Sequence, residues 1–183
     1  MKRTIIIAVI FLALIFVLFF LPLFTDLSIS NRKNPSEKIY FTDGKEFVIS
    51  YTHSVNKGRV HDYYKTDGKN FVLYKTEFVS YGAGMPEIEE TPGAVFYEAD
   101  GTYTMEYKRN VGRSFLLSVG VIARHSISIN GNEFFLEDFF EPKTSLVFNN
   151  KKIPIIEYTI SKIEYKKLTT GDLIERQRNF TKE

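Results

Sequence analysis

The chain opens with a long apolar run and continues with short alternating patterns. Ile5 to Leu21 is an unbroken run of 17 apolar residues, and no charge occurs between Arg3 and Asp26. At about 1.5 Å per residue, a helix over this uncharged stretch spans the roughly 30 Å hydrocarbon core of a bilayer. The run therefore predicts a transmembrane helix, and we assign residues 1–24 to a membrane anchor that contacts lipid through residues 4–24.

The flanks of this run suggest how the anchor is oriented. Lys2 and Arg3 precede it, which favours a cytoplasmic N-terminus and an exterior remainder of the chain. A cleaved secretory signal is the alternative, but such signals have a shorter apolar region followed by small residues. This chain carries Phe19, Phe20 and Leu21 there. We expect an uncleaved, single-pass anchor in the cytoplasmic membrane, with the domain on the extracytoplasmic side.

Farther along the chain, the hydrophobic pattern has a period of two. Tyr103, Met105 and Tyr107 alternate with polar residues, and a longer alternation runs from Phe115 to Ile129. Such alternation is typical of antiparallel sheets with one buried face. We predict an all-β fold over residues 39–170, an antiparallel sandwich or partly closed barrel, in which residues 153–168 form one long or bulged strand. Tight hairpin turns are predicted at Asp43-Gly44, Asp67-Gly68, Asp100-Gly101 and Asn130-Gly131.

The remaining segments and the composition narrow the classes of function. Residues 25–38 are expected to form a polar linker, and residues 171–183 a charged C-terminal tail. The chain has no cysteine, which excludes disulfides, thiolate metal sites and a cysteine nucleophile. Beyond the anchor, 22 basic and 22 acidic residues balance, so the domain lacks the basic excess expected of a nucleic-acid-binding protein.

One predicted hairpin places ionisable residues among apolar ones. On the strand that begins at Phe47, His53 shares the apolar side with Tyr51. If paired residues have numbers that sum to 115, His53 faces Asp62 and Tyr51 faces Tyr64. A shift by one residue would instead bury the charged side of the second strand, which costs far more. We therefore predict that His53 and Asp62 lie side by side on the inner face.

Several interpretations of this pair stay open. It can be a polar pair that fixes the strand register, part of a pocket for a small polar ligand, or, with His125, a metal site. Ser54 next to His53 suggests a serine nucleophile, but neighbouring side chains on a strand project to opposite faces, which argues against a hydrolase. The glycine-rich bend at residues 82–84 either exposes N–H groups to an anion or simply turns the chain. The candidate ligand-binding residues are Tyr51, His53, Asp62, Tyr64, Gly82, Ala83, Gly84 and His125, with no catalytic residue, metal or cofactor expected.

Part of this pattern is similar to a known family. Residues 51–55 (Tyr-Thr-His-Ser-Val), then Val60 and Asp62, then residues 78–86, resemble the bacterial domain-of-unknown-function family numbered 1850. In that family the position of Asp62 is commonly Glu. Members are small secreted or anchored proteins, often encoded beside tripartite ATP-independent periplasmic (TRAP) transporters of the TAXI subclass. The resemblance implies an accessory role near solute uptake, with a solute or a transporter component as partner and no established enzymatic activity. A scaffolding module of the cell envelope without a ligand is the alternative.

Overall fold

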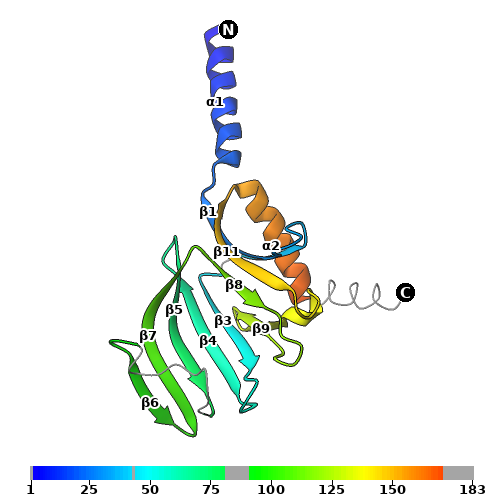
Figure 1. Cartoon of the computed structure of the whole chain (residues 1–183). Coiled ribbons are helices and arrows are strands. Elements are labelled where there is room, and N and C mark those ends of the chain that lie inside the picture. The colour runs from blue at the N-terminus through cyan, green and yellow to red at the C-terminus, as the bar shows by residue number, and fades with distance from the viewer. Residues whose placement is uncertain (1, 43, 81–90, 171–183) are drawn as a thin grey trace, which may run out of the picture.

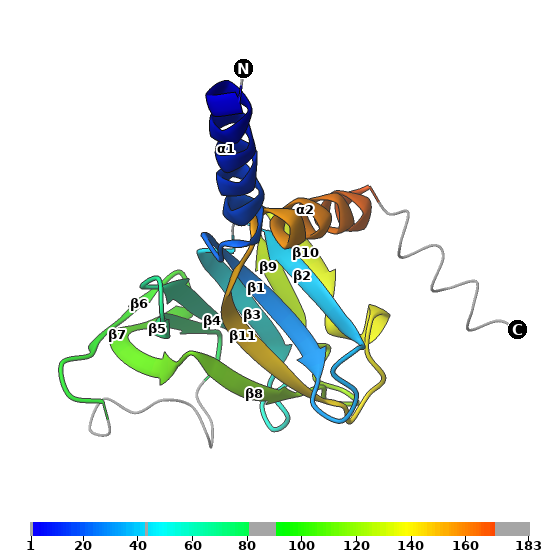
Figure 2. The same ribbon diagram turned by 90° about the horizontal axis from the view of Figure 1, so that it is seen from above.

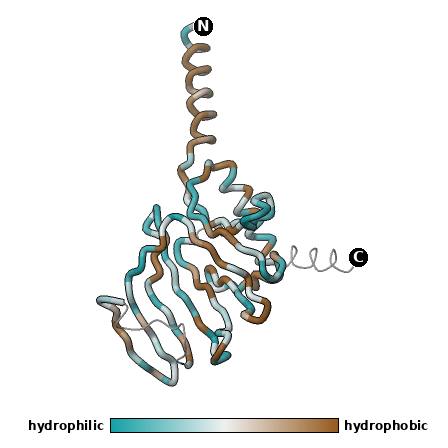
Figure 3. The backbone as a smooth tube through the Cα atoms, in the orientation of Figure 1, coloured by the Kyte–Doolittle hydropathy of each residue, from teal (hydrophilic) through white to brown (hydrophobic). Residues whose placement is uncertain are grey.

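One apolar helix precedes a domain of two antiparallel sheets (Figure 1). The structure is a computed structural model that describes residues 2–42, 44–80 and 91–170. Helix α1 (Lys2–Phe20) projects from the domain, and its Arg3–Phe20 segment is a candidate membrane span by length and composition. Figure 3 shows it as the longest continuously apolar segment of the backbone. A single apolar helix in front of an antiparallel β domain confirms the predicted fold class.

The described residues form eleven strands in two layers. The smaller sheet has the order β2-β1-β11-β8, and the larger has the order β10-β9-β3-β4-β5-β7-β6. The strands of the smaller sheet are β1 (Phe24–Asn31), β2 (Lys38–Thr42), β8 (Ser114–Ser118) and β11 (Ser145–Ile153). Those of the larger sheet are β3 (Glu46–Thr52), β4 (Arg59–Thr66), β5 (Phe71–Phe78), β6 (Val95–Ala99), β7 (Thr102–Gly112), β9 (Ser126–Ile129) and β10 (Asn132–Phe135).

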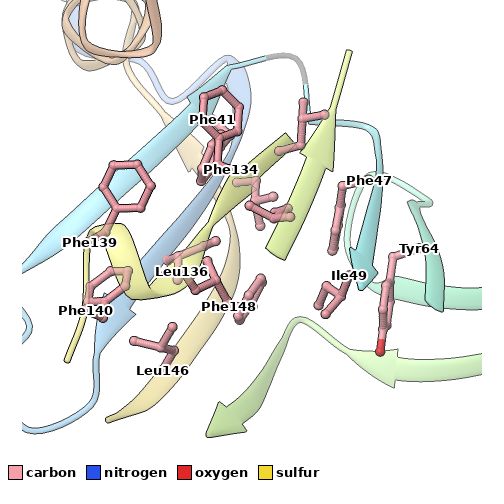
Figure 4. Packing of buried hydrophobic residues seen from close by; sticks show 14 of the residues in the cluster. Phe41, Phe47, Ile49, Tyr64, Phe134, Leu136, Phe139, Phe140, Leu146 and Phe148 are labelled. Carbon is pink, nitrogen blue, oxygen red and sulfur yellow. The ribbon is translucent and has the colours of Figure 1, made fainter. Parts of the chain in front are cut away.

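Aromatic side chains fill the space between the sheets (Figure 4). Rings stack in sequence from Phe47 on β3 to Tyr64 on β4, with centroids 5.2 Å apart, and on to Phe115 on β8 at 5.1 Å. Phe115 in turn stacks on Phe148 of β11 at 4.7 Å. Because these four rings come from both sheets, their burial holds the two layers face to face.

Two of the predicted hairpin turns have the backbone geometry that the sequence requires. Asp100 and Gly101 both have positive φ, 52° and 75°, and they join β6 to β7. Asn130 and Gly131, at 51° and 78°, join β9 to β10 in the same way. Positive φ at both central residues is the mark of the tight turn that matches strand twist.

The segment expected to be a polar linker instead contains a central strand. β1 lies between β2 and β11, and its Leu27 and Ile29 belong to the main hydrophobic cluster. Its outward-facing Asp26 and Ser28 are also buried. The linker prediction for residues 25–38 is thus wrong over β1, because polar residues on one side of a central strand concealed its alternation.

The segment expected to be one long strand divides into a strand and a helix. β11 ends at Ile153, Pro154 follows in an extended conformation, and α2 (Ile155–Thr169) begins after it. Tyr158, Tyr165 and Leu168, which are spaced for one helix face, contact the domain. α2 lies beside β2 and β1 (Figure 2). The isoleucine and tyrosine content suggested a strand, and the contacts of this face decide for a helix.

One further sequence prediction is wrong, and two others fall outside the described residues. The alternation from Phe115 to Ile129 predicts one strand, but the structure splits it into β8 and β9, which belong to different sheets. The intervening turn bends sharply at Gly120, where a Cβ would lie 2.8 Å from the Cβ of Ala123. The glycine-rich bend at 82–84 and the charged tail at 171–183 lie outside the described residues.

If β1 is part of the core, truncating its buried apolar side chain must destabilise the domain. We expect Ile29→Ala to lower the free energy of unfolding by about 3 kcal/mol, because a fully buried side chain is replaced by a cavity. Leu116→Ala is the matched control, since Leu116 is exposed on the same sheet and should change stability little. Urea unfolding of both variants measures the difference. Equal, small changes in the free energy of unfolding of both variants would show that β1 is a linker and not part of the core.

Candidate functional site

The β3–β4 hairpin sets the positions of most predicted site residues. In its register Tyr51 faces Val60, Ile49 faces Asp62 and Phe47 faces Tyr64. The predicted pairing of His53 with Asp62 is therefore wrong by four residues. The predicted faces are right, because a shift by an even number of residues leaves every side chain on the same side of the sheet.

His53 lies beyond the end of β3 and shapes the turn. Its backbone N–H donates to the carbonyl of Gly58 at 2.8 Å, and its ring Nδ1 accepts the N–H groups of Val55 and Asn56, each at 3.4 Å. The residue opposite Asp62 is Ile49, four positions back, which corresponds to about 13 Å along an extended strand. His53 is thus a turn residue and is not a neighbour of Asp62.

Asp62 instead joins a polar group on the inner face of the larger sheet. Thr76 Oγ1 on β5 donates to Asp62 Oδ1 at 2.7 Å. Tyr107 on β7 lies 2.6 Å from the same Thr76 oxygen. Because the single Thr76 proton is directed at the carboxylate, the Tyr107 hydroxyl is the donor in the second bond. A chain of hydrogen bonds therefore runs from Tyr107 through Thr76 to Asp62.

Two further tyrosines complete what we call the Asp62 cluster. Burial is the main cause that raises the pKa of Tyr51 and of Tyr64, and the charge of Asp62 raises both further. The Tyr107 pKa is also raised by burial. All three tyrosines are therefore neutral hydrogen-bond donors at physiological pH. The Asp62 cluster comprises Tyr51, Asp62, Tyr64, Thr76 and Tyr107.

The carboxyl of Asp62 titrates unusually high. Burial raises its pKa to about 6, against the opposing effects of the Thr76 hydrogen bond and the charge of Arg109. A carboxylate placed in a low-dielectric environment favours its protonated form. The Asp62 cluster therefore changes charge close to neutral pH.

Part of the hydrogen-bonding capacity of this cluster is unused. Among the described residues, Asp62 Oδ2 and the hydroxyls of Tyr51 and Tyr64 have no hydrogen-bond partner. None of these three atoms is fully sealed from solvent, and Asp62 as a whole is partly exposed. The cluster thus presents one acceptor and two donors that a small molecule can satisfy.

His125 borders the cluster without joining its hydrogen bonds. Its ring stacks on Tyr51 with centroids 5.6 Å apart, and its Nδ1 accepts the Gly120 N–H at 3.1 Å. Burial and the nearby Arg59 lower its pKa. His125 is therefore a neutral ring with its proton on Nε2, and it supports one side of Tyr51.

His53 belongs to a second location, at the loop end of the sheet. It lines a hollow of about 210 Å³ with the β3–β4 turn on one side and the β8–β9 turn on the other. The structure thus divides the predicted site: Tyr51, Asp62 and Tyr64 come together with His125 beside them, whereas His53 lies apart. The hollow is lined by Thr52, His53, Ser54, Lys57, Ile122 and Ala123.

The outer face of the sheet carries a serine–histidine contact that involves Ser50 and not Ser54. Ser50 Oγ and His61 Nδ1 share a hydrogen bond of 2.8 Å. The carboxylate opposite His61 is Glu77, which accepts from Tyr63 and Lys75 instead. Within the described residues no carboxylate orients His61, so this pair lacks the third member of a hydrolase triad.

A metal site built from the predicted residues is not assembled. His53 lies in the β3–β4 turn, His125 stacks on Tyr51, and Asp62 accepts a hydrogen bond from Thr76. The described residues contain no group of three His, Cys, Asp or Glu side chains placed to hold a metal. Sequence analysis missed Thr76 as a cluster residue. It predicted the inward direction of Tyr107 from the alternation around it, but it could not pair β7 with β5.

The fold and the site define an antiparallel two-sheet β domain, carried behind a candidate membrane-spanning helix, with a polar cluster inside its larger sheet. Residues 47–136 match the model of the family described as Domain of unknown function (DUF1850). All five residues of the Asp62 cluster lie within the matched region. Searches of curated proteins and of solved structures gave no match.

The raised pKa of Asp62 predicts a pH-dependent stability. The folded state binds the Asp62 proton more tightly than the unfolded chain, so this group costs stability as the pH rises from about 4 to above about 6. Asp62→Asn keeps an acceptor for Thr76 and removes the charge. We expect this variant to exceed the wild type by about 2 kcal/mol near pH 8 and to match it near pH 4, measured by urea unfolding.

Asp67→Asn is the control for this experiment. The Asp67 side chain accepts the N–H groups of Lys69 and Asn70, which lower its pKa, so the change should bring no gain near neutral pH. An Asp62→Asn variant that is no more stable than the wild type at any pH would show that Asp62 is not held in a desolvated site.

Proposed function

We propose that this chain is a membrane-anchored, extracytoplasmic β domain that binds a small polar solute at the Asp62 cluster. The observation that carries the proposal is the unused hydrogen-bonding capacity of Asp62 Oδ2 beside the hydroxyls of Tyr51 and Tyr64. Because none of these three atoms is sealed from solvent, each can bond to water or to a solute that displaces that water. A solute with a matching donor and acceptor would make these hydrogen bonds in place of water.

The chemistry of the cluster suggests the class of solute. Asp62 Oδ2 accepts hydrogen bonds, so it favours a hydroxyl or ammonium donor. The tyrosine hydroxyls add donors for a second polar atom, and the tyrosine rings offer apolar surface and cation–π contact. A polyol, sugar or small amine meets these requirements, whereas a dicarboxylate meets the ionised Asp62 unfavourably.

The candidate membrane span supports an accessory role in uptake as part of this proposal. A domain held at the membrane by α1 keeps a bound solute close to the site where a transporter would take it up. The resemblance to a family encoded near TRAP transporters motivates that role. In the scaffolding alternative the same residues only stabilise the sheet, and no solute would bind.

A thermal-shift experiment on the full chain in detergent tests the solute proposal. The probes are glucose, putrescine and succinate at millimolar concentration near pH 8. We expect glucose or putrescine to raise the melting temperature, succinate to have no effect, and Asp62→Asn to abolish the shift. His53→Ala is the matched control and should retain the shift, because His53 lies outside the cluster. No shift with any probe, or an unchanged shift in Asp62→Asn, would favour the scaffold.

A second candidate function, docking to a transporter component, is favoured by the loop end of the sheet. Val55, Val79, Val121 and Ile122 are exposed there, and Ile122 is 70% exposed at the hollow that His53 lines. Asn56 Nδ2 donates to the Ser80 carbonyl, which ties two of these loops together. Figure 1 shows β3 and β5 ending on the side of the domain away from α1. Exposed aliphatic clusters of this kind often mark protein contacts.

Site-specific photo-crosslinking tests this contact in cells. A benzophenone amino acid at position 122 should crosslink to a transporter subunit that mass spectrometry identifies. The same group at position 116, which is exposed within β8 and outside the turns, should not. Crosslinks from position 122 only to further copies of this chain would contradict the transporter contact.

A further inference from the structure

Helix α2 presents an apolar stripe to its surroundings. Ile156, Ile160 and Ile163 follow the spacing i, i+4, i+7, and each is about half exposed. That spacing places them on one face of a helix. The opposite face is already occupied, since Tyr165 and Leu168 pack on the main hydrophobic cluster. The isoleucines therefore form a second apolar face that the described residues leave about half exposed.

The position of α2 beside α1 suggests what covers this face. The rings of Phe24 and Tyr158 stack with centroids 4.5 Å apart, which fixes the first turns of α2 next to the start of β1. The candidate span ends at Phe20, and four extended residue steps reach at most about 14 Å. Figures 1 and 2 both show the start of α2 at the domain end of α1. With α1 in a bilayer, the first turns of α2 lie at the headgroup boundary.

The charges along this segment match an anionic surface. Between residues 151 and 167 the chain has five lysines and two glutamates. Lys151 pairs with Glu157 at 3.5 Å, so the surplus is carried by the other lysines. Lys162 and Lys166 lie on α2 itself, are exposed, and flank the isoleucines on one side. An apolar stripe with neighbouring lysines is the pattern of a helix that lies in a membrane interface.

We propose that α2 is an interfacial helix whose isoleucine stripe inserts into the headgroup region of an anionic bilayer, the first two turns most deeply. The proposal rests on α1 being the membrane anchor, and it adds a second attachment that fixes how the β domain stands on the membrane. Neither solute binding at Asp62 nor the loop-end contact is needed for it.

Fluorescence quenching in nanodiscs tests this contact in the full chain. Because the chain has no cysteine, single variants Ile156→Cys and Ile160→Cys can each carry one environment-sensitive fluorophore. The discs contain phosphatidylglycerol and a lipid with a nitroxide near its headgroup. We expect both labels to be quenched several-fold more than a label on Ile122→Cys, which is exposed at the far end of the domain.

One further label, a disulfide assay and a change of lipid decide among the outcomes. A label on Leu12→Cys must be quenched by a nitroxide placed deep in the acyl chains; if it is not, α1 is not in the bilayer and the proposal is overturned together with the anchor. If Leu12 is quenched but Ile156 and Ile160 match Ile122, the anchor stands and the interfacial role of α2 is overturned. Disulfide formation between two Ile160→Cys copies, without quenching, would assign the stripe to a second copy. Equal quenching in pure phosphatidylcholine would overturn the requirement for anionic lipid.

Discussion

The stack of aromatic rings between the two sheets is the constraint on which the remaining structure depends. Tyr64 lies between Phe47 and Phe115 in that stack, so β4 must point this residue inward. Side chains two positions apart on a strand share a face, and Asp62 is therefore turned inward as well. The burial of large aromatic groups contributes several kcal/mol, which outweighs the cost of desolvating one carboxyl.

The consequence is a polar layer that interrupts the apolar interior. On one side lies the main cluster with Ile49 and Tyr64, and on the other the smaller cluster of Val60 and Phe78. Asp62 and Thr76 sit between them, opposite each other on β4 and β5. The hydrogen-bond chain from Tyr107 satisfies one carboxylate oxygen and leaves the second available. The Asp62 cluster thus lies at the boundary between the main hydrophobic cluster and the smaller one.

The sequence predicted correctly which side of a strand each residue lies on, but it did not predict which residues pair across neighbouring strands. Alternation along β4 was enough to place Asp62 and Tyr64 inside, because it depends only on the next residues of the same strand. The register of β3 on β4 depends on the number of residues in the turn between them, which alternation does not reveal. His53 does not lie beside Asp62, because its ring bonds to backbone N–H groups within that turn. The spacing of Tyr158, Tyr165 and Leu168 could have revealed α2, but its isoleucines have strong β propensity.

The presence of β1 also changes how closely the domain is joined to α1, the candidate membrane span. A flexible linker over residues 25–38 would have let the domain move through about 46 Å, since 14 residues reach roughly that far when extended. The structure leaves only the short connection between Phe20 and Phe24, because Leu27 and Ile29 are locked in the core. The short connection therefore keeps the start of the β domain close to the end of the candidate membrane span. The same buried strand therefore both stabilises the sandwich and joins it closely to the candidate membrane span.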